Sequence, residues 1–175
     1  MENELTLRRL TLNDVLPLSL LARKTFYDSF TGTCTAADMQ HFLSYYYNEA
    51  TLAKEIQDNT MQYYFAEINN VPVGYILYKE ANAIFLGVNE NKSVELKRFY
   101  VLQSHHGKGI AQYMMNHFLD FAINNKYSTA FLGVWEYNSR AQYFYAKYGF
   151  KRTKGRHDFP IGKTMQSDIY LMKEF

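Results

Sequence analysis

Residues 104–115 read SHHGKGIAQYMM, two glycines followed directly by a run of helix-forming residues. Glycine weakens a helix interior by roughly 1 kcal/mol, so Gly107 and Gly109 predict a turn that leads into a helix over about residues 108–124. The apolar residues of that helix form one stripe: Ile110, Met114, Phe118 and Phe121. The first N–H groups of such a helix lack partners, and the helix dipole adds partial positive charge there. The sequence therefore predicts a site for a phosphate group at residues 107–111.

The glycine turn matches neither of two common phosphate-binding motifs. A P-loop has Ser or Thr after its lysine, whereas Gly109 follows Lys108. The dinucleotide-binding fingerprint needs a small residue where Gln112 stands, and it follows a β-α alternation that the preceding residues lack. What remains is a phosphate cradle made of backbone N–H groups, which needs no magnesium.

The order of predicted elements is typical of a mixed α/β fold. A strand at residues 5–10 precedes helices, and aromatic and β-branched residues dominate from residue 61 onward. Asn69 and Asn70 suit a tight turn between antiparallel strands, whereas Pro160 and Gly162 predict a loop before the last strand. The expected strands lie at 5–10, 61–68, 71–80, 94–101, 128–136, 149–153 and 167–175, and the expected helices at 15–26, 36–48, 49–58, 108–124 and 138–148. One domain over residues 1–175, of α/β (α+β) class, is expected.

The alternation of faces slips within the expected strand at 94–101. Val94 and Leu96 are two residues apart, as on one buried face, but the next apolar residue, Phe99, is three residues further on. A β-bulge produces such a slip, because one extra residue enters one strand. We expect the bulge to splay this strand from the strand at 128–136. The resulting slot would let an amide-bearing chain pair like an added strand.

Composition argues against several functions. The chain has 19 Lys and Arg against 17 Asp and Glu, a net charge of +2 without a basic block, so nucleic acid is not an expected partner. The single cysteine, Cys34, permits no internal disulfide. The chain opens without the features of a signal peptide and has no long apolar segment, so a cytoplasmic protein without membrane contact is expected. The adjacent His105 and His106 do not have a chelating spacing, and no metal site is predicted.

Three segments together resemble one enzyme family: VELKRFYV at 94–101, HGKGIAQYMM at 106–115 and VWEYNSRAQYFYAKYGF at 134–150. In this order they resemble the strand, the pyrophosphate loop and the tyrosine helix of the GNAT superfamily of N-acetyltransferases. The loop pattern of that family is Gln or Arg, two residues, Gly, one residue, then Gly or Ala. It falls on His106, Gly109 and Ala111, so His106 departs from the pattern. The segments TFYDSF and LGVWE look most like the PaiA-type polyamine acetyltransferases of bacteria.

This resemblance implies a fold, a co-substrate and its contacts. The implied GNAT fold has a mixed, mostly antiparallel sheet of about six to seven strands, splayed at the cofactor strand and flanked by helices. Acetyl-CoA is the implied co-substrate, with its pantetheine arm along Phe99, Tyr100 and Val101. Its pyrophosphate is implied to rest on the glycine turn, at His106, Gly107, Lys108, Gly109, Ile110 and Ala111. By the same resemblance Asn138 contacts the pantetheine and Tyr145 protonates the departing thiolate, for which a phenol, protonated at neutral pH, is suited.

The sequence leaves the general base open. Attack on the thioester requires a neutral amine, so a carboxylate or a water chain must take a proton from the ammonium group. Glu95, on the cofactor strand, is the first candidate, although it equally fits a solvated charge at a strand edge. Glu136, at the end of the next strand, is an alternative base or amine anchor. Many relatives carry a further carboxylate two residues after the position of Glu95, where this chain has Lys97.

Carboxylates and aromatic rings are expected to bind a cationic amine. Phe26 and Asp28 supply both near the amino end, and Asp158 lies in the expected late loop beside His157, Phe159 and Asp168. Each residue alone equally fits a packed ring or a helix cap. With the resemblance, they favour a small-molecule primary amine, first of all a polyamine such as spermidine, acetylated by direct attack in a ternary complex. The alternatives are a protein or peptide amine and a non-catalytic acetyl-CoA-binding regulatory domain, and either a monomer or a homodimer is expected.

Overall fold

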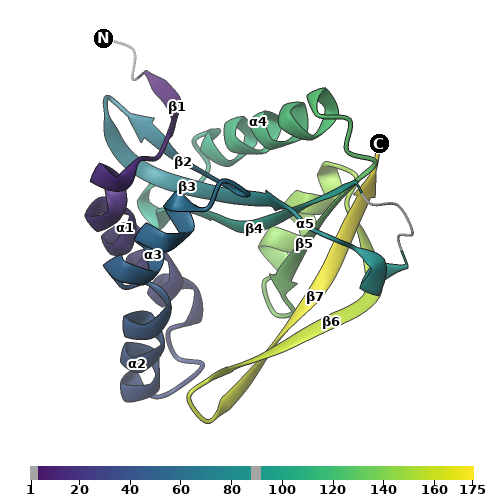
Figure 1. The fold of residues 1–175 in the computed structure, drawn as a ribbon. Coiled ribbons are helices and arrows are strands. Elements are labelled where there is room, and N and C mark those ends of the chain that lie inside the picture. The colour runs from purple at the N-terminus through teal and green to yellow at the C-terminus, as the bar shows by residue number, and fades with distance from the viewer. Residues whose placement is uncertain (1–3, 88–91) are drawn as a thin grey trace.

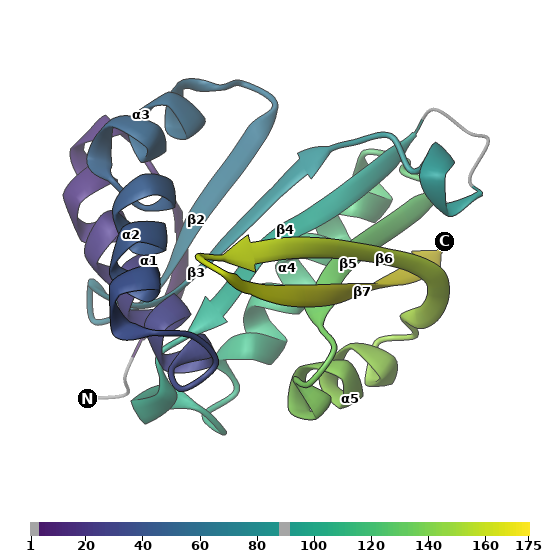
Figure 2. The ribbon, with the colours of Figure 1, turned by 90° about the horizontal axis from the view of Figure 1, so that it is seen from below.

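The computed structural model describes residues 4–87 and 92–175, and in them a seven-stranded sheet lies between helices (Figure 1, Figure 2). Its strands are β1 (Leu5–Arg9), β2 (Met61–Ile68), β3 (Val71–Glu80), β4 (Ser93–Val101), β5 (Thr129–Trp135), β6 (Lys151–Ile161) and β7 (Thr164–Glu174). Its α-helices are α1 (Val15–Phe30), α2 (Ala36–Tyr46), α3 (Glu49–Gln57), α4 (Ile110–Asn124) and α5 (Ser139–Lys147), with short 3-10 helices η1 (Leu12–Asp14), η2 (Ile84–Leu86) and η3 (Gln103–His105). No helix in the described residues is both long and apolar enough to cross a bilayer.

The strands run in the order β1-β2-β3-β4-β5-β7-β6 across the sheet. All neighbouring strands are antiparallel except β4 and β5, which are parallel and are joined by the crossover through α4. The predicted mixed, mostly antiparallel sheet is therefore confirmed.

Two hydrophobic cores lie on opposite faces of the sheet. Helices α1, α2 and α3 cover one face, where Leu18, Phe26 and Leu52 pack with residues of β2 and β3. Helices α4 and α5 cover the other face, and the predicted stripe of α4 packs there, with Ile110, Met114 and Phe118 buried and Phe121 partly buried. The helices on the two faces thus hold the central strands β4 and β5 from both sides.

Local turn chemistry agrees with the sequence at the first hairpin. Asn69 and Asn70 join β2 to β3 and both have positive φ angles, +51° and +63°. Asparagine tolerates this left-handed conformation better than most residues, and a two-residue turn of this kind matches the twist of the strands. The hairpin predicted from the pair of asparagines is confirmed.

The bulge predicted in β4 falls on Lys97. Leu77 of β3 pairs with Arg98, but the next residue of β3, Tyr78, pairs with Leu96, so Lys97 has no partner on β3. The face alternation slips there as expected: Leu96 packs against α4, whereas Tyr100 packs on the side of α1. The extra residue bends the strand and increases its twist.

The same strand separates from β5 just before the bulge. Parallel pairing between β4 and β5 covers only residues 93–95 and ends with Glu95 opposite Phe131. In the described part of the chain, the edge of β4 from Leu96 to Val101 that faces β5 therefore has no strand partner. The splayed slot expected from the sequence is present.

The prediction of a loop around Pro160 and Gly162 is wrong. These residues belong to a long hairpin in which β6 reaches Ile161 and β7 begins at Thr164. Proline is tolerated because β6 is the edge strand of the sheet, where a missing N–H group need not break a ladder bond. Gly162 forms the turn with a φ of +61°, and an added Cβ there would overlap the carboxyl group of Asp38. The tip of the hairpin thus lies against α2, as Figure 2 shows.

Candidate active site

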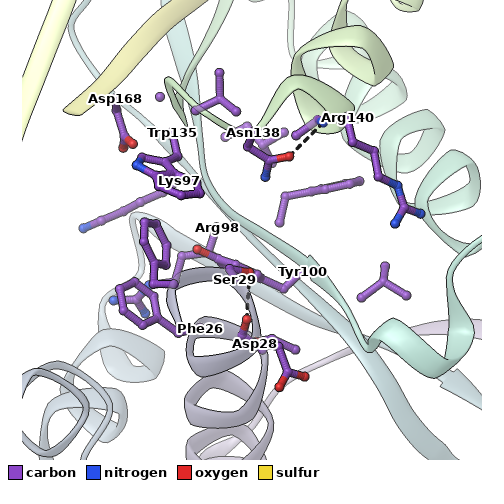
Figure 3. Close-up of a pocket in the computed structure, with 18 of the residues that line it drawn as sticks. Phe26, Asp28, Ser29, Lys97, Arg98, Tyr100, Trp135, Asn138, Arg140 and Asp168 are labelled. Carbon is purple, nitrogen blue, oxygen red and sulfur yellow. Dashed lines mark hydrogen bonds between the residues drawn. The ribbon is translucent and has the colours of Figure 1, made fainter. Parts of the chain in front are cut away.

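A cavity of about 630 Å³ lies where β4 and β5 part (Figure 3). Its walls come from α1, α2, β4, β5, α5 and the β6–β7 hairpin. One end reaches the glycine turn, with His106, Ala111, Asn138 and Arg140 in its wall. The other end lies between α1, α2 and the hairpin and is rich in aromatic rings. The cavity therefore joins a potential phosphate site to a second chamber through the gap in the sheet.

The glycine turn has the backbone that its sequence predicts. Gly107 and Gly109 have φ angles of +78° and +81°, and Gly109 is the N-cap of α4. A Cβ at either glycine would meet nothing within 4 Å, so the glycines are needed for their conformation and not for space. Lys108 lies between the two glycines, and the side chain of Ile110 is buried in the core. Because the glycines and Ile110 present no side chain to solvent, the turn offers their backbone N–H groups to a ligand at the start of a 15-residue helix.

His106 is held between a backbone carbonyl and an arginine. Its Nε2 lies 2.9 Å from the carbonyl oxygen of Val101, and its Nδ1 lies 2.7 Å from Nη1 of Arg140. Because a guanidinium group only donates hydrogen bonds, Nδ1 must accept, and Nε2–H donates to the carbonyl. His106 thereby places the Arg140 guanidinium beside the glycine turn. Sequence reasoning missed Arg140.

Helix α5 positions the two residues expected at the reacting end of the cofactor. Asn138 is the N-cap of this helix, and its Oδ1 accepts a hydrogen bond of 3.0 Å from the N–H of Ala141. Tyr145 lies two turns further on, is only 7% exposed, and packs edge-on against Phe99 of β4. Burial, and then the charge of Asp168, raise the pKa of Tyr145 well above its usual value near 10. Tyr145 is therefore protonated at neutral pH, and its hydroxyl makes no hydrogen bond to the described residues.

Asp168 is the carboxylate that reaches the cavity from β7. It pairs in register with Trp135 of β5, and Figure 3 shows the two side chains close together. Gly133 makes room for it, because an added Cβ at that position would lie 3.2 Å from Oδ2 of Asp168. Burial raises the pKa of Asp168 to about 6, although His157 opposes the shift. Among the described residues it has no ion pair or hydrogen-bond donor, so the carboxylate is available to a ligand.

The three other acidic candidates lie outside this cavity. Glu95 lies on β4 at the last pair with β5, before the slot opens. Glu136 forms an ion pair of 2.7 Å with Arg156, and Asp158 accepts a hydrogen bond from the hydroxyl of Ser167. On β6, His157 and Phe159 line the cavity, so strand alternation turns Asp158, which lies between them, to the opposite face.

The remaining predicted residues share the cavity wall. Phe26 and Asp28 lie on α1 at the aromatic end, and Asp28 forms an ion pair of 2.5 Å with Lys24. Phe99, Tyr100 and Val101 line the splayed part of β4. The structure thus brings together the predicted acceptor residues of α1, the cofactor strand and the tyrosine helix. Of the expected late segment it includes His157, Phe159 and Asp168, it adds Arg140, and it leaves out Glu95, Glu136 and Asp158.

The sequence matches the model of the Acetyltransferase (GNAT) family over residues 23–150. The chain belongs to the GNAT family of acetyltransferases. It is 30% identical to an uncharacterized N-acetyltransferase of Lactobacillus delbrueckii subsp. lactis. The aligned region of 153 residues covers 87% of each chain. Its fold is similar to that of the PaiA N-acetyltransferase of Thermoplasma acidophilum in complex with coenzyme A, with a TM-score of 0.79 and 20% identity. That match covers 98% of this chain and 99% of the PaiA chain. The fold is also similar to that of the spermidine/spermine N-acetyltransferase SpeG of Vibrio cholerae, with a TM-score of 0.65 and 21% identity. This second match covers 98% of this chain and 92% of the SpeG chain.

As a GNAT N-acetyltransferase, the protein uses acetyl-CoA as its co-substrate, and the cavity fits that molecule. The N–H groups of the glycine turn and the guanidinium of Arg140 suit a pyrophosphate. The open edge of β4 offers backbone partners to the two amides of a pantetheine arm.

Replacing Arg140 by Ala is expected to weaken CoA binding about 10- to 100-fold. A hydrogen bond to a charged group contributes roughly 1.5–3 kcal/mol, and His106 holds the guanidinium of Arg140 beside the turn. Titration calorimetry with CoA measures the change. Arg152→Ala, which removes an arginine of β6 outside this cavity, is the control and should leave the affinity within twofold. Equal affinities for Arg140→Ala and the unaltered protein would remove Arg140 from the phosphate site.

Proposed function

We propose that this acetyltransferase moves the acetyl group of acetyl-CoA to a primary amine that Asp168 binds and deprotonates, while Tyr145 protonates the departing thiolate. The observation that supports the proposal is the arrangement of one half-buried carboxylate and one buried phenol in the same cavity, beside the gap between β4 and β5. Both residues line this cavity, and the charge of Asp168 contributes to the raised pKa of Tyr145.

The proton transfers follow from the two side chains. A carboxylate whose pKa is about 6 is charged at pH 7.5 and can take a proton from the bound ammonium group. The neutral amine then attacks the acetyl carbon, the C–N bond forms and the C–S bond breaks. The hydroxyl of Tyr145 gives its proton to the sulfur and recovers one from solvent. Asp168 and the nitrogen of the new amide each release one proton to solvent, so that the reaction releases one proton in net. The thioester supplies the activated acetyl group for this direct attack.

Two further groups assist in this proposal. The backbone N–H of Phe99 lies on the splayed strand and is proposed to donate to the thioester oxygen as negative charge develops there. The side-chain Nδ2 of Asn138 is proposed to contact the pantetheine, since its Oδ1 is already occupied by the helix cap. The glycine turn, from His106 to Ala111, is proposed to hold the pyrophosphate.

A polyamine such as spermidine is the acceptor that the sequence predicts. The names of the PaiA and SpeG proteins, whose folds are similar, support it, as do the rings and the carboxylate of Phe26 and Asp28 in the cavity wall. Below 25% identity these likenesses show the fold, so the acceptor stays a prediction. Release of free thiol from acetyl-CoA, measured with spermidine, spermine, simple monoamines, a lysine peptide and an amine-free blank, tests the proposed activity. Thiol release no faster than the blank with every amine, in protein that binds acetyl-CoA, would favour the non-catalytic domain.

The activity is expected to depend on pH through Asp168. Below a pKa of about 6 this carboxyl is protonated and cannot accept a proton, so kcat/KM should fall about tenfold per pH unit on the acid side. Above about pH 6 the carboxyl group of Asp168 is charged, and its titration should no longer change kcat/KM. Initial rates between pH 5 and pH 8, at fixed ionic strength, measure it. A profile that lacks an acid limb near pH 6 would exclude Asp168 as the base.

A further inference from the structure

The acceptor end of the cavity has walls made largely of aromatic rings. Phe26 stacks on Phe30 and Phe42, with ring centroids 4.5 and 4.6 Å apart. Tyr46 continues this array beyond Phe42 at 4.4 Å, and Trp135 of β5 lies 5.0 Å from Phe30 on the side of the gap. All five rings line the cavity. Such a surface binds apolar or aromatic groups by excluding water from both partners.

Few of the charged groups at this end are available to a ligand. The cavity wall there holds the carboxylates of Asp28 and Asp168 and the cations of Lys97 and Arg98. Asp28 is already paired with Lys24 at 2.5 Å. Arg98 is paired with Glu55 at 2.6 Å, beneath the rings of Tyr47 and Tyr63. Of these four residues, only Asp168 and Lys97 form no ion pair with another described residue.

The free carboxylate of Asp168 can neutralise a single positive charge, whereas the free ammonium group of Lys97 can neutralise none. A first ammonium of the acceptor satisfies Asp168 at the gap, next to Tyr145. A second ammonium further out would find rings, the Asp28–Lys24 pair and the Lys97 cation, with no carboxylate left to pair with. The bulge adds to this exclusion, because its extra residue, Lys97, contributes a cation to the cavity wall.

We propose that the acceptor of this enzyme is a primary monoamine with an aromatic or apolar body. This inference rests on the proposed function, since it assumes that the reacting amine lies at Asp168. The rings of α1, α2 and β5 bind the body, Asp168 binds the one ammonium group, and Lys97 disfavours an acceptor that carries another. A polyamine is the competing acceptor.

A matched pair of amines tests the inference. Hexylamine and cadaverine have nearly the same length and differ in that one terminal methyl group is replaced by an ammonium group. We expect kcat/KM for hexylamine and phenethylamine to exceed that for cadaverine and spermidine at least tenfold at pH 7.5. Equal or higher kcat/KM for cadaverine or spermidine would overturn the inference while leaving the acetyltransferase activity in place.

Lys97→Met separates the charge effect from the fit of the chain. Methionine keeps an unbranched apolar side chain of similar length, so the rate with hexylamine should change less than threefold. The preference for hexylamine over cadaverine should shrink at least threefold. Lys154→Met, on β6 outside this cavity, is the control and should leave the preference unchanged. An unchanged preference in Lys97→Met would remove the role of Lys97 in selection.

Binding tests the same inference without turnover. Calorimetry with hexylamine and cadaverine, added to protein saturated with CoA, compares their affinities directly. Tighter binding of hexylamine by tenfold or more supports the inference even when no amine releases thiol, which would contradict only the proposed catalysis. Equal affinities, or tighter binding of cadaverine, would overturn the inference.

Discussion

Asp168→Asn is expected to lower kcat at pH 7.5 by about 100-fold or more, because an amide cannot take the proton of the bound ammonium group. General bases contribute roughly 10²- to 10⁴-fold to a rate, and Asp168 is the unpaired carboxylate in the cavity wall. The affinity for CoA should change less than threefold, since the phosphate site lies at the other end. Steady-state kinetics with the best amine, together with calorimetry for CoA, measure both quantities.

The same substitution is expected to leave the fold as stable as before or more stable. Burial raises the pKa of Asp168 in the folded protein to about 6, above the unfolded value near 3.9. Between these two values the folded state binds the proton more tightly, so stability due to this group is lost as the pH rises through 6. Above pH 6 the buried charge is unfavourable, and Asn removes it. We expect the Tm of Asp168→Asn at pH 7.5 to be equal or higher by roughly 2 °C.

Asp158→Asn provides a matched control one strand away. Asp158 of β6 accepts a hydrogen bond from Ser167 and lies outside the cavity, so its replacement should change kcat less than twofold. A loss of activity in Asp158→Asn, or full activity in Asp168→Asn, would show that the wrong carboxylate has been assigned.

Tyr145→Phe is expected to lower kcat by about 100-fold with little change in CoA affinity. The phenylalanine keeps the ring contacts with Phe99, Phe144 and Phe150, and the hydroxyl makes no hydrogen bond to the described residues, so folding should be unaffected. What is lost is the proton that the thiolate receives as the C–S bond breaks. Kinetics at pH 7.5 and CoA titration measure the two effects.

Tyr143→Phe, on the exposed side of the same helix, is the control for this experiment. Its ring is 67% exposed and lies outside the cavity wall, so kcat should remain unchanged. Turnover of Tyr145→Phe within threefold of that of the unaltered protein would remove Tyr145 from the acid role.

Local chemistry made the cofactor half of the site predictable. The pair Gly107 and Gly109 requires positive φ angles before a helix, and the structure has them. The slip between Leu96 and Phe99 requires an extra residue in β4, and the bulge falls on Lys97. The position of Tyr145 two turns after Asn138 follows from helical spacing. Each of these signals is contained within about ten residues of sequence.

The acceptor half depends on contacts between distant segments. Asp168 reaches the cavity because β7 lies beside β5 and because Gly133 leaves space for its carboxylate, and neither fact is visible in the sequence around residue 168. Between the expected strands at 149–153 and 167–175 the sequence predicts a loop, because Pro160 disfavours a strand unless that strand lies at the edge of a sheet, as β6 does. Arg140 reaches the glycine turn through His106, 34 residues earlier in the chain.

A crystal structure with CoA and hexylamine bound is the most direct test of the central claim, that the gap between β4 and β5 holds the reacting groups. The claim predicts that the pyrophosphate lies on the N–H groups of residues 107–111. It also predicts that the sulfur lies about 3 Å from the hydroxyl of Tyr145, with the amine nitrogen at hydrogen-bond distance from Asp168. A sulfur away from Tyr145, or an amine bound at Glu95 or Glu136 with Asp168 unoccupied, would contradict it.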